Sequence, residues 1–188
     1  MPVDRDALVD SLQTLLAAVD LPDRADDRVL SERLDRVMAS ATQVLQVDGV
    51  GLMLLDEQDS LRVAGASDEV SAALEHSQQR LGEGPGIDCV RFDRTVAVED
   101  LGTSPQYAAV WRWLRQYAEN DGGSETPVVR AVLSVPVRVH GAIVGTLNAL
   151  RLEPVRWGSD HVRAVEAYAG IVGVLIRLGR QERRAGIG

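Results

Sequence analysis

The chain has no lysine, and all 20 of its basic residues are arginines. Without a lysine amine it cannot form a Schiff base with a substrate or cofactor, nor hold a phosphate with a loop lysine. Its one cysteine, Cys89, excludes an intramolecular disulfide, a CxxC redox pair and a zinc site built from cysteines. These absences remove several enzyme classes and favour a cytoplasmic protein.

Long apolar runs and clustered positive charge are also missing. No run approaches the roughly 20 residues of a membrane-spanning helix, and the acidic N-terminus has no signal-peptide pattern. The net charge is -8 with no basic tract, so neither a nucleic acid nor a membrane is expected as a partner. The 188 residues, 45% of them hydrophobic, suffice for one domain with a sizeable core.

Five short apolar runs predict strands, mostly in hairpin order, which favours an antiparallel sheet in an α+β fold. Pro136 interrupts one run and predicts a sheet edge or a bulge there. His140 and Gly141 predict a tight turn between the last two strands. The predicted strands cover residues 50–55, 61–66, 95–100, 132–139 and 142–151.

Apolar residues at steps of three and four predict helices before, between and after these strands. The last helix carries two apolar stripes and needs two surfaces to cover them, so we expect a homodimer through the terminal helices. The expected division is an N-terminal helix and linker at 1–27, the main domain at 28–182 and a tail at 183–188. The predicted helices cover 4–19, 28–46, 68–80, 87–92, a segment beginning at Ser104-Pro105, and a segment from Ser159. Candidate dimer contacts are Leu8, Leu12, Leu15, Leu34, Val165, Val172 and Ile176.

Several segments, in this order and spacing, resemble the GAF domain, and most closely the GAF modules of actinobacterial GAF-ANTAR regulators. They are VDGVGLMLLD, LRVAGASDE, LGEGPGIDCVRFDRTVAVEDL, VLSVPVRVHGAIVGTLNAL and WGSDHVRAVEAYAGIVGVLI. The resemblance implies a PAS-related, six-stranded antiparallel sheet. Its N- and C-terminal helices would cover one face, and short helices and loops would lie over a pocket on the other. The sequence ends at Gly188 without an RNA-binding ANTAR segment, and Gly86 stands where such relatives usually have cysteine.

The candidate pocket residues come from the glycine-rich loop, the aromatic helix and the last two strands. LGEGPG at 81–86 is either an anion cradle or a turn that needs glycine. Cys89 is either a sensor or bilin-attachment thiol or a buried structural residue. Tyr107, Val110, Trp111, Leu114 and Tyr117 form an aromatic stripe at helical spacing, which is either a ligand wall or core. Ser134, Thr146 and Asn148 on the last two strands could supply the polar groups of a pocket. Of the three histidines only His76 could face the pocket, and each is either a haem or metal ligand or a solvated surface residue. The candidates are Glu83, Gly84, Asp88, Cys89, Arg91, Tyr107, Trp111, Ser134 and Asn148.

No nucleophile and base pattern and no metal-ligand spacing occurs, so we expect no catalytic activity and no metal, and the cofactor is unknown. The cyclic-nucleotide signature of phosphodiesterase GAF domains requires a lysine that is absent. The prediction is a sensory domain that binds a small ligand or responds to redox state and signals through a homodimer to a partner output protein. The alternatives are a ligand-free structural or dimerisation module and a haem or chromophore sensor.

Overall fold

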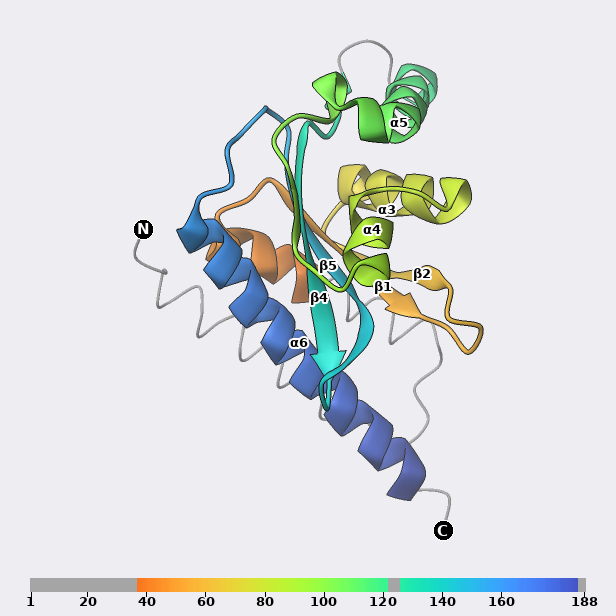
Figure 1. Cartoon of the computed structure of the whole chain (residues 1–188), viewed down its shortest axis with the longest axis vertical. Coiled ribbons are helices and arrows are strands. Elements are labelled where there is room, and N and C mark those ends of the chain that lie inside the picture. Colours follow the sequence, from red (N-terminus) through yellow and green to blue (C-terminus); the bar gives the residue numbers. More distant parts are fainter. Residues whose placement is uncertain (1–36, 122–125, 186–188) are drawn as a thin grey trace.

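A five-stranded antiparallel sheet with helices on both faces forms the centre of the computed structural model, which describes residues 37–121 and 126–185 (Figure 1). The strand order is β2-β1-β5-β4-β3. The predicted α+β class and the arrangement implied by the resemblance are confirmed. The described sheet has five strands where the resemblance implied six, and these five are the ones that the apolar runs predict. They are β1 (Gly49–Leu55), β2 (Leu61–Ala66), β3 (Val96–Val98), β4 (Ala131–Val139) and β5 (Ala142–Arg151).

The β4–β5 hairpin has both features that its sequence predicts. His140 and Gly141 form its turn with φ angles of 51° and 82°, in the left-handed region. Because β3 pairs only with residues 132–134 of β4, Pro136 lies where β4 is an edge strand, and a bulge follows at Val137/Arg138. A proline that cannot donate to a ladder is therefore placed where no donor is needed on that side.

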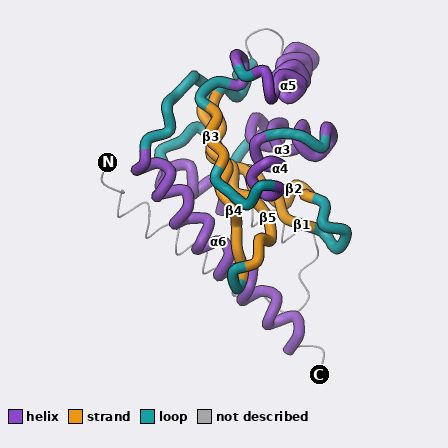
Figure 2. The backbone as a smooth tube through the Cα atoms, viewed as in Figure 1, coloured by secondary structure: helices purple, strands orange, loops and turns teal. Residues whose placement is uncertain are grey.

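The helices occur close to their predicted positions (Figure 2). Residues 37–45 are helical, within the predicted 28–46 segment, whereas the predicted helix at 4–19 lies outside the described residues. Ser104 begins a 3-10 turn without capping through its side chain, so the long α-helix starts only at Ala108. The elements are α3 (Glu69–Leu81), α4 (Pro85–Arg91), η1 (Leu101–Thr103), η2 (Pro105–Tyr107), α5 (Ala108–Asp121) and α6 (Ser159–Ala185).

One face of the sheet is largely apolar and packs against α6 and the helix at 37–45. Strand residues alternate between faces, and the residues of β1, β4 and β5 that are buried on this side are Val, Leu or Ala. Tyr168 of α6 joins the two helices by donating a hydrogen bond from its hydroxyl to the carbonyl of Val37, at 3.3 Å. The strand residues on this face are Val50, Leu52, Leu133, Val135, Val137, Leu147 and Ala149.

The opposite face is covered by α3, α4 and α5, with a second apolar cluster at the α5 end. Tyr107, Val110 and Leu114 are buried there, as their helical spacing predicts. Tyr117, which is on the same predicted stripe, is 40% exposed and stacks on Trp113 with ring centroids 5.2 Å apart.

The residues predicted as dimer contacts fall into two groups in the structure. Leu8, Leu12, Leu15 and Leu34 lie outside the described residues. Val165 and Val172 are buried against the sheet of their own chain, out of reach of a second one, and Ile176 is partly buried. The side of α6 that remains exposed contains Arg163, Ala167, Gly170 and Val174. The domain division at residues 27/28 and 182/183 remains a prediction.

Gly173 and Gly170 provide a matched pair for testing how closely α6 approaches the sheet. A Cβ at Gly173 would lie 2.2 Å from the carbonyl oxygen of Arg138, whereas a Cβ at Gly170 would meet nothing within 4 Å. Gly173→Ala is expected to destabilise the fold by about 1–3 kcal/mol, because the obstructing atom is backbone. Gly170→Ala is expected to be neutral or stabilising by up to about 1 kcal/mol through helix propensity. Urea unfolding of both variants measures the difference, and equal changes in unfolding free energy would contradict this packing.

Candidate functional site

Helix α3 turns a polar stripe toward the sheet. Its N-terminus is fixed by Asp68, whose carboxylate accepts a hydrogen bond from the Ser71 amide at 2.8 Å. Its C-terminus is at Gly82, in the left-handed conformation with φ 66°. Between these caps Ser71, Glu75 and Gln78, at steps of four and three, are all completely buried. Their spacing places them on one helix face, and that face is the one against β1 and β5.

The sheet residues beneath this stripe are also small or polar. Gly51 on β1, Asn148 on β5 and Ser134 on β4 are register partners, so they form one row across three strands. Thr146 lies two residues before Asn148 on the same face, and its hydroxyl lies 3.3 Å from Asn148 Oδ1. This row interrupts an otherwise apolar interior.

The helix stripe and the sheet row meet in a buried group that we name the polar cluster, made of the hydrogen-bonded Glu75, Gln78, Thr146 and Asn148 together with Ser134. Asn148 Nδ2 donates to both carboxylate oxygens of Glu75, at 2.9 and 2.8 Å, and Gln78 Nε2 donates to Glu75 Oε2 at 2.9 Å. A Cβ at Gly51 would lie 2.0 Å from Glu75 Oε1. Only glycine at this position allows the carboxylate to lie directly on β1.

The environment of the cluster strongly perturbs Glu75. Burial raises the pKa of its carboxyl to about 8, because loss of hydration outweighs the hydrogen bonds from Asn148 and Gln78. None of the salt bridges found among the described residues involves Glu75. The Oγ of Ser134, fully buried beside Asn148, has no hydrogen-bond partner within the described part of the chain. The cluster thus holds an acid without a counterion and a spare hydroxyl.

Helix α4 lies over the cluster, and its glycines make the close approach possible. The Gly86 amide donates to Gln78 Oε1 at 2.7 Å. A Cβ on Gly84, where φ is 144°, would lie 2.5 Å from the same oxygen. Gln78 therefore links α4 to Glu75, through its carbonyl on one side and its amide nitrogen on the other.

A second set of contacts, which we name the clasp, attaches α4 to η2. Asp88 Oδ2 accepts hydrogen bonds from the Tyr107 hydroxyl at 3.0 Å and from Gln106 Nε2 at 2.7 Å. Arg91 Nη1 reaches the other oxygen of Asp88 at 3.4 Å. Burial, and then the neighbouring Asp88, raise the pKa of Tyr107 above its usual range, so the hydroxyl stays protonated and donates. The clasp holds α4 in place at the end away from Gln78.

Cys89 lies on α4 and is completely buried. Burial raises the pKa of its thiol to about 11, and the Thr146 hydroxyl only partly offsets this. A thiol reacts through its thiolate, so a buried thiol with a raised pKa, as Cys89 has here, is poorly reactive.

The structure brings together most of the residues predicted from the sequence. Ser134 and Asn148 belong to the polar cluster. Gly84, Asp88, Cys89 and Tyr107 are buried at α4 or in its clasp. Arg91, at the end of α4, pairs with Asp88 but is exposed, and Glu83 is exposed just before the helix. Trp111 lies apart from them, under the Arg130 guanidinium at 5.2 Å from the ring centroid.

Glu75 and Gln78 are the cluster residues that sequence reasoning missed. A polar stripe on a helix next to an apolar one is normally its solvent face. The signal that could have located them is Gly51, since an isolated glycine inside a strand indicates close approach of another group. His76, the histidine predicted to be nearest the pocket, is exposed, with Nδ1 2.8 Å from the Ala72 carbonyl oxygen.

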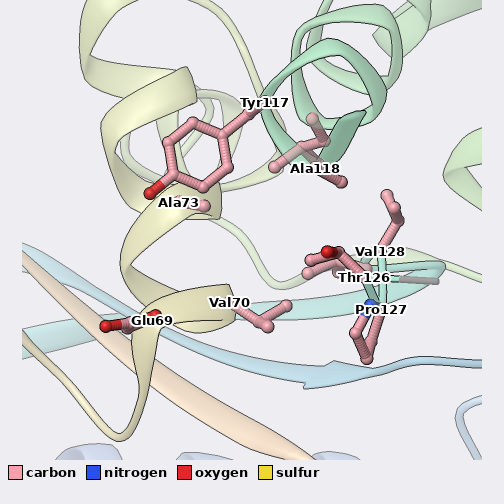
Figure 3. A pocket seen from close by; sticks show the side chains of 10 residues that line it. Glu69, Val70, Ala73, Tyr117, Ala118, Thr126, Pro127 and Val128 are labelled. Carbon is pink, nitrogen blue, oxygen red and sulfur yellow. The ribbon is translucent and has the colours of Figure 1, made fainter. Parts of the chain in front are cut away.

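Two hollows lie beside α5, and no cluster residue lines either of them. One, of about 40 Å³ between α3 and α5, is bordered by Val70, Ala73 and Pro127 and has room for a water molecule or two (Figure 3). The other, of about 340 Å³, is open and lined partly by Trp111 and Arg130. Arg130 is held there by Asp100 at 2.8 Å.

The family model described as GAF domain matches residues 29–176 of this chain. The chain belongs to the GAF family. Its α3, α4 and β5 are the elements that enclose the cluster just described. GAF domains are sensory and regulatory modules.

Solved structures resemble this GAF domain in fold at low sequence identity. The GAF domain of a phosphoenolpyruvate-protein phosphotransferase from Coxiella burnetii is 15% identical, with a TM-score of 0.62 over 95% of this chain and 98% of that one. Free methionine-R-sulfoxide reductase from Neisseria meningitidis is 17% identical, with a TM-score of 0.60 over 96% and 95%. The GAF domain of the cyanobacteriochrome TePixJ is 18% identical, with a TM-score of 0.58 over 86% and 94%. No curated protein matches the chain.

The GAF fold is generally non-catalytic, but the reductase shows that the fold also serves an enzyme, so fold alone does not decide catalysis.

Residues 37–121 and 126–185 of this GAF domain contain no group of three or more His, Cys, Asp or Glu side chains placed to hold a metal. Over the same residues, no helix combines the length and apolarity needed to cross a membrane.

The perturbed carboxyl of Glu75 predicts how the stability of this GAF domain depends on pH. Its folded-state pKa of about 8 is above the ordinary glutamate pKa of 4.5, so between these values the folded state holds a proton that the unfolded state has lost. Stability should fall as pH rises from 5 to 8, by up to about 1.4 kcal/mol per pH unit, and level off above 8. Glu75→Gln should lose this dependence in urea unfolding series, while the exposed control Glu69→Gln keeps it. A wild-type stability unchanged from pH 5 to 8 would contradict the assignment.

Proposed function

We propose that this chain is a non-catalytic sensory GAF domain whose polar cluster binds a small ligand beneath α4, and that it signals as a homodimer. The observation that carries the proposal is the buried Glu75 with its amide partners Gln78 and Asn148. A completely buried acid without a counterion is costly. A group retained at such cost is a candidate functional site.

The opposite face of the same sheet supports this interpretation. There, β5 buries Leu147 and Ala149 against α6, whereas on the cluster side the alternating residues are Thr146 and Asn148. Well-packed apolar side chains generally stabilise a core as well as a buried charged or polar network does. Stability of the sheet therefore does not explain why polar residues are buried in the cluster, whereas recognition of a ligand explains it.

The lid supplies a route into the cluster. Helix α4 has seven residues and rests on the cluster through Gly86 and on η2 through Asp88. Movement of α4 breaks a few hydrogen bonds and uncovers Gln78, Asn148 and Thr146 together. A ligand that favours one position of the lid shifts the population of the two positions.

The structure favours the ligand over the redox and chromophore variants of the sensory hypothesis. Cys89 is buried with a raised pKa, which suits neither a redox-sensing thiol nor an attachment point open to solvent. We further propose that the chain is related to the GAF modules of actinobacterial GAF-ANTAR regulators, which the segment matches support.

The proposed location is cytoplasmic and the proposed partner is an output protein. The net charge of -8 supports the expectation that neither a nucleic acid nor a membrane is a partner.

A ligand-free structural or protein-interaction module is the second candidate. The observation that favours it is that cluster side chains already fill the space beneath α4 and bond to one another. In that case the function of the domain would not require α4 to move away from the cluster.

The single cysteine provides a test of the lid. Tyr107→Phe removes one clasp hydrogen bond of about 1–2 kcal/mol, so Cys89 should react with a thiol reagent about 5- to 30-fold faster in native buffer. The exposed Tyr117→Phe is the matched control and should react at the wild-type rate.

Compounds from a panel of amines, carboxylates, nucleotides and sugars that occupy the cluster should raise the thermal midpoint and alter the labelling rate. Equal labelling of both variants, with no active compound in the panel, would establish the ligand-free alternative.

The exposed side of α6 is the surface that we propose for the homodimer. Ala167, Gly170 and Val174 are exposed at steps of three and four, and the last turns of α6 extend beyond the β4–β5 hairpin (Figure 1). Small side chains allow two helices to approach closely. Because β5 contributes to both faces of the sheet, a change beneath α4 can reach α6 through this strand.

Light scattering at micromolar concentration measures the oligomeric state. The proposed dimer should have about twice the 20.3 kDa of one chain, and Val174→Glu should lower this mass by placing charges against each other. Gln116→Glu, exposed on α5 and away from this surface, adds the same single charge and is the control. A wild-type mass of one chain would overturn the dimer.

A further inference from the structure

Glu75 has only neutral partners on every element packed around it. On its own helix it contacts Gln78, on β5 Asn148, and on β1 the backbone at Gly51. Helix α4 contributes no direct partner to Glu75, because its Gly86 amide donates to Gln78 and its Cys89 thiol, whose pKa is raised to about 11, lies beside Thr146. Three arginines on neighbouring segments pair with other acids, Arg91 with Asp88, Arg138 with Asp93 and Arg130 with Asp100. No ion pair found among the described residues reaches Glu75, so its ionised form has no counterion there.

The cluster also has unused hydrogen-bonding capacity. A carboxylate offers about four lone-pair positions, of which Asn148 and Gln78 fill three. Ser134 Oγ, fully buried and directly across from Asn148, has no partner within the described residues. A ligand that donates two or more hydrogen bonds would complete both groups.

We propose that the ligand of this site carries a protonated nitrogen, an ammonium or amidinium group, and that this group binds the Glu75 carboxylate in place of the Asn148 amide. The inference rests on the proposed ligand-binding function and specifies its chemical class. An anion would meet the charge of Glu75 in a site of low dielectric, where repulsion is strong. A neutral donor gains less than a cation, whereas an amidinium presents two parallel N–H groups that match a carboxylate.

The proton on Glu75 makes this class measurable. With a pKa of about 8, the unliganded carboxyl is mostly protonated at pH 7, so binding of a cation must release that proton. Apparent affinity should therefore weaken by up to tenfold for each pH unit below 8. A neutral or anionic ligand would release no proton from Glu75.

Acetamidinium and acetamide form a matched pair of probes, since they have the same shape and differ in charge. At a concentration tenfold above its dissociation constant, acetamidinium should raise the thermal midpoint of the wild type by about 3 °C at pH 8, and less at pH 6.5. Acetamide, and sodium chloride at equal ionic strength, should not. Glu75→Gln should abolish the difference between the two probes, whereas Glu69→Gln should retain it.

Calorimetry on the wild-type protein gives a measurement that does not depend on any variant folding. Titration of acetamidinium at pH 7 in phosphate and in Tris, whose ionisation enthalpies differ, should report release of close to one proton. Equal effects of acetamidinium and acetamide on the wild type, or no released proton, would overturn the cationic class. If compounds of another class then bind and alter Cys89 labelling, the proposed sensory function still holds. If no compound of any class binds, the proposed function fails as well.

Discussion

The contact between the Glu75 carboxylate and the bare backbone of Gly51 determines how closely α3 approaches the sheet. Because no Cβ intervenes, the carboxylate lies within hydrogen-bond reach of Asn148 on the next strand. Gln78, one helical turn later, is then placed to bond both Glu75 and the lid at Gly86. The absence of a side chain at Gly51 therefore lets one carboxylate connect α3 to β5 and, through Gln78, to α4. A Cβ at Gly51 would displace the Glu75 carboxylate and with it the hydrogen bonds from Asn148 and Gln78.

The two faces of the sheet meet different physical requirements with the same strands. Against α6, burial of Val, Leu and Ala supplies the non-directional stabilisation that holds the domain together. Beneath α4, hydrogen bonds between fixed donors and acceptors take the place of apolar burial. Such bonds depend on direction as well as distance. A small displacement weakens the second face much more than the first. The domain thus combines a layer held by non-directional apolar packing with one whose contacts depend on hydrogen-bond geometry.

The sequence predicted the five strands, the hairpin turn and the last helix because each depends on local pattern and turn chemistry. It failed where tertiary contacts reverse a local rule. Glu75 and Gln78 have the pattern of a solvent face until β1 is placed against them. Tyr117 continues an apolar stripe but is 40% exposed and stacks on Trp113 instead. Ser134 and Asn148 were identifiable because polar residues inside apolar strands stand out, whereas polar residues on a helix do not.

Strand β5 is the physical link between the proposed ligand site and the proposed output helix. Thr146 and Asn148 face the cluster, while Leu147 and Ala149, between and beside them, pack under α6. Gly145 keeps the same strand within a close approach to β1, since a Cβ there would lie 2.1 Å from the Met53 carbonyl oxygen. A close-packed strand of this kind cannot move on one face alone. A rotation of β5 about its own axis that moves Asn148 in one direction moves Leu147, on the other face, in the opposite direction. A change of hydrogen bonding beneath α4 can in this way alter how α6 packs on the sheet.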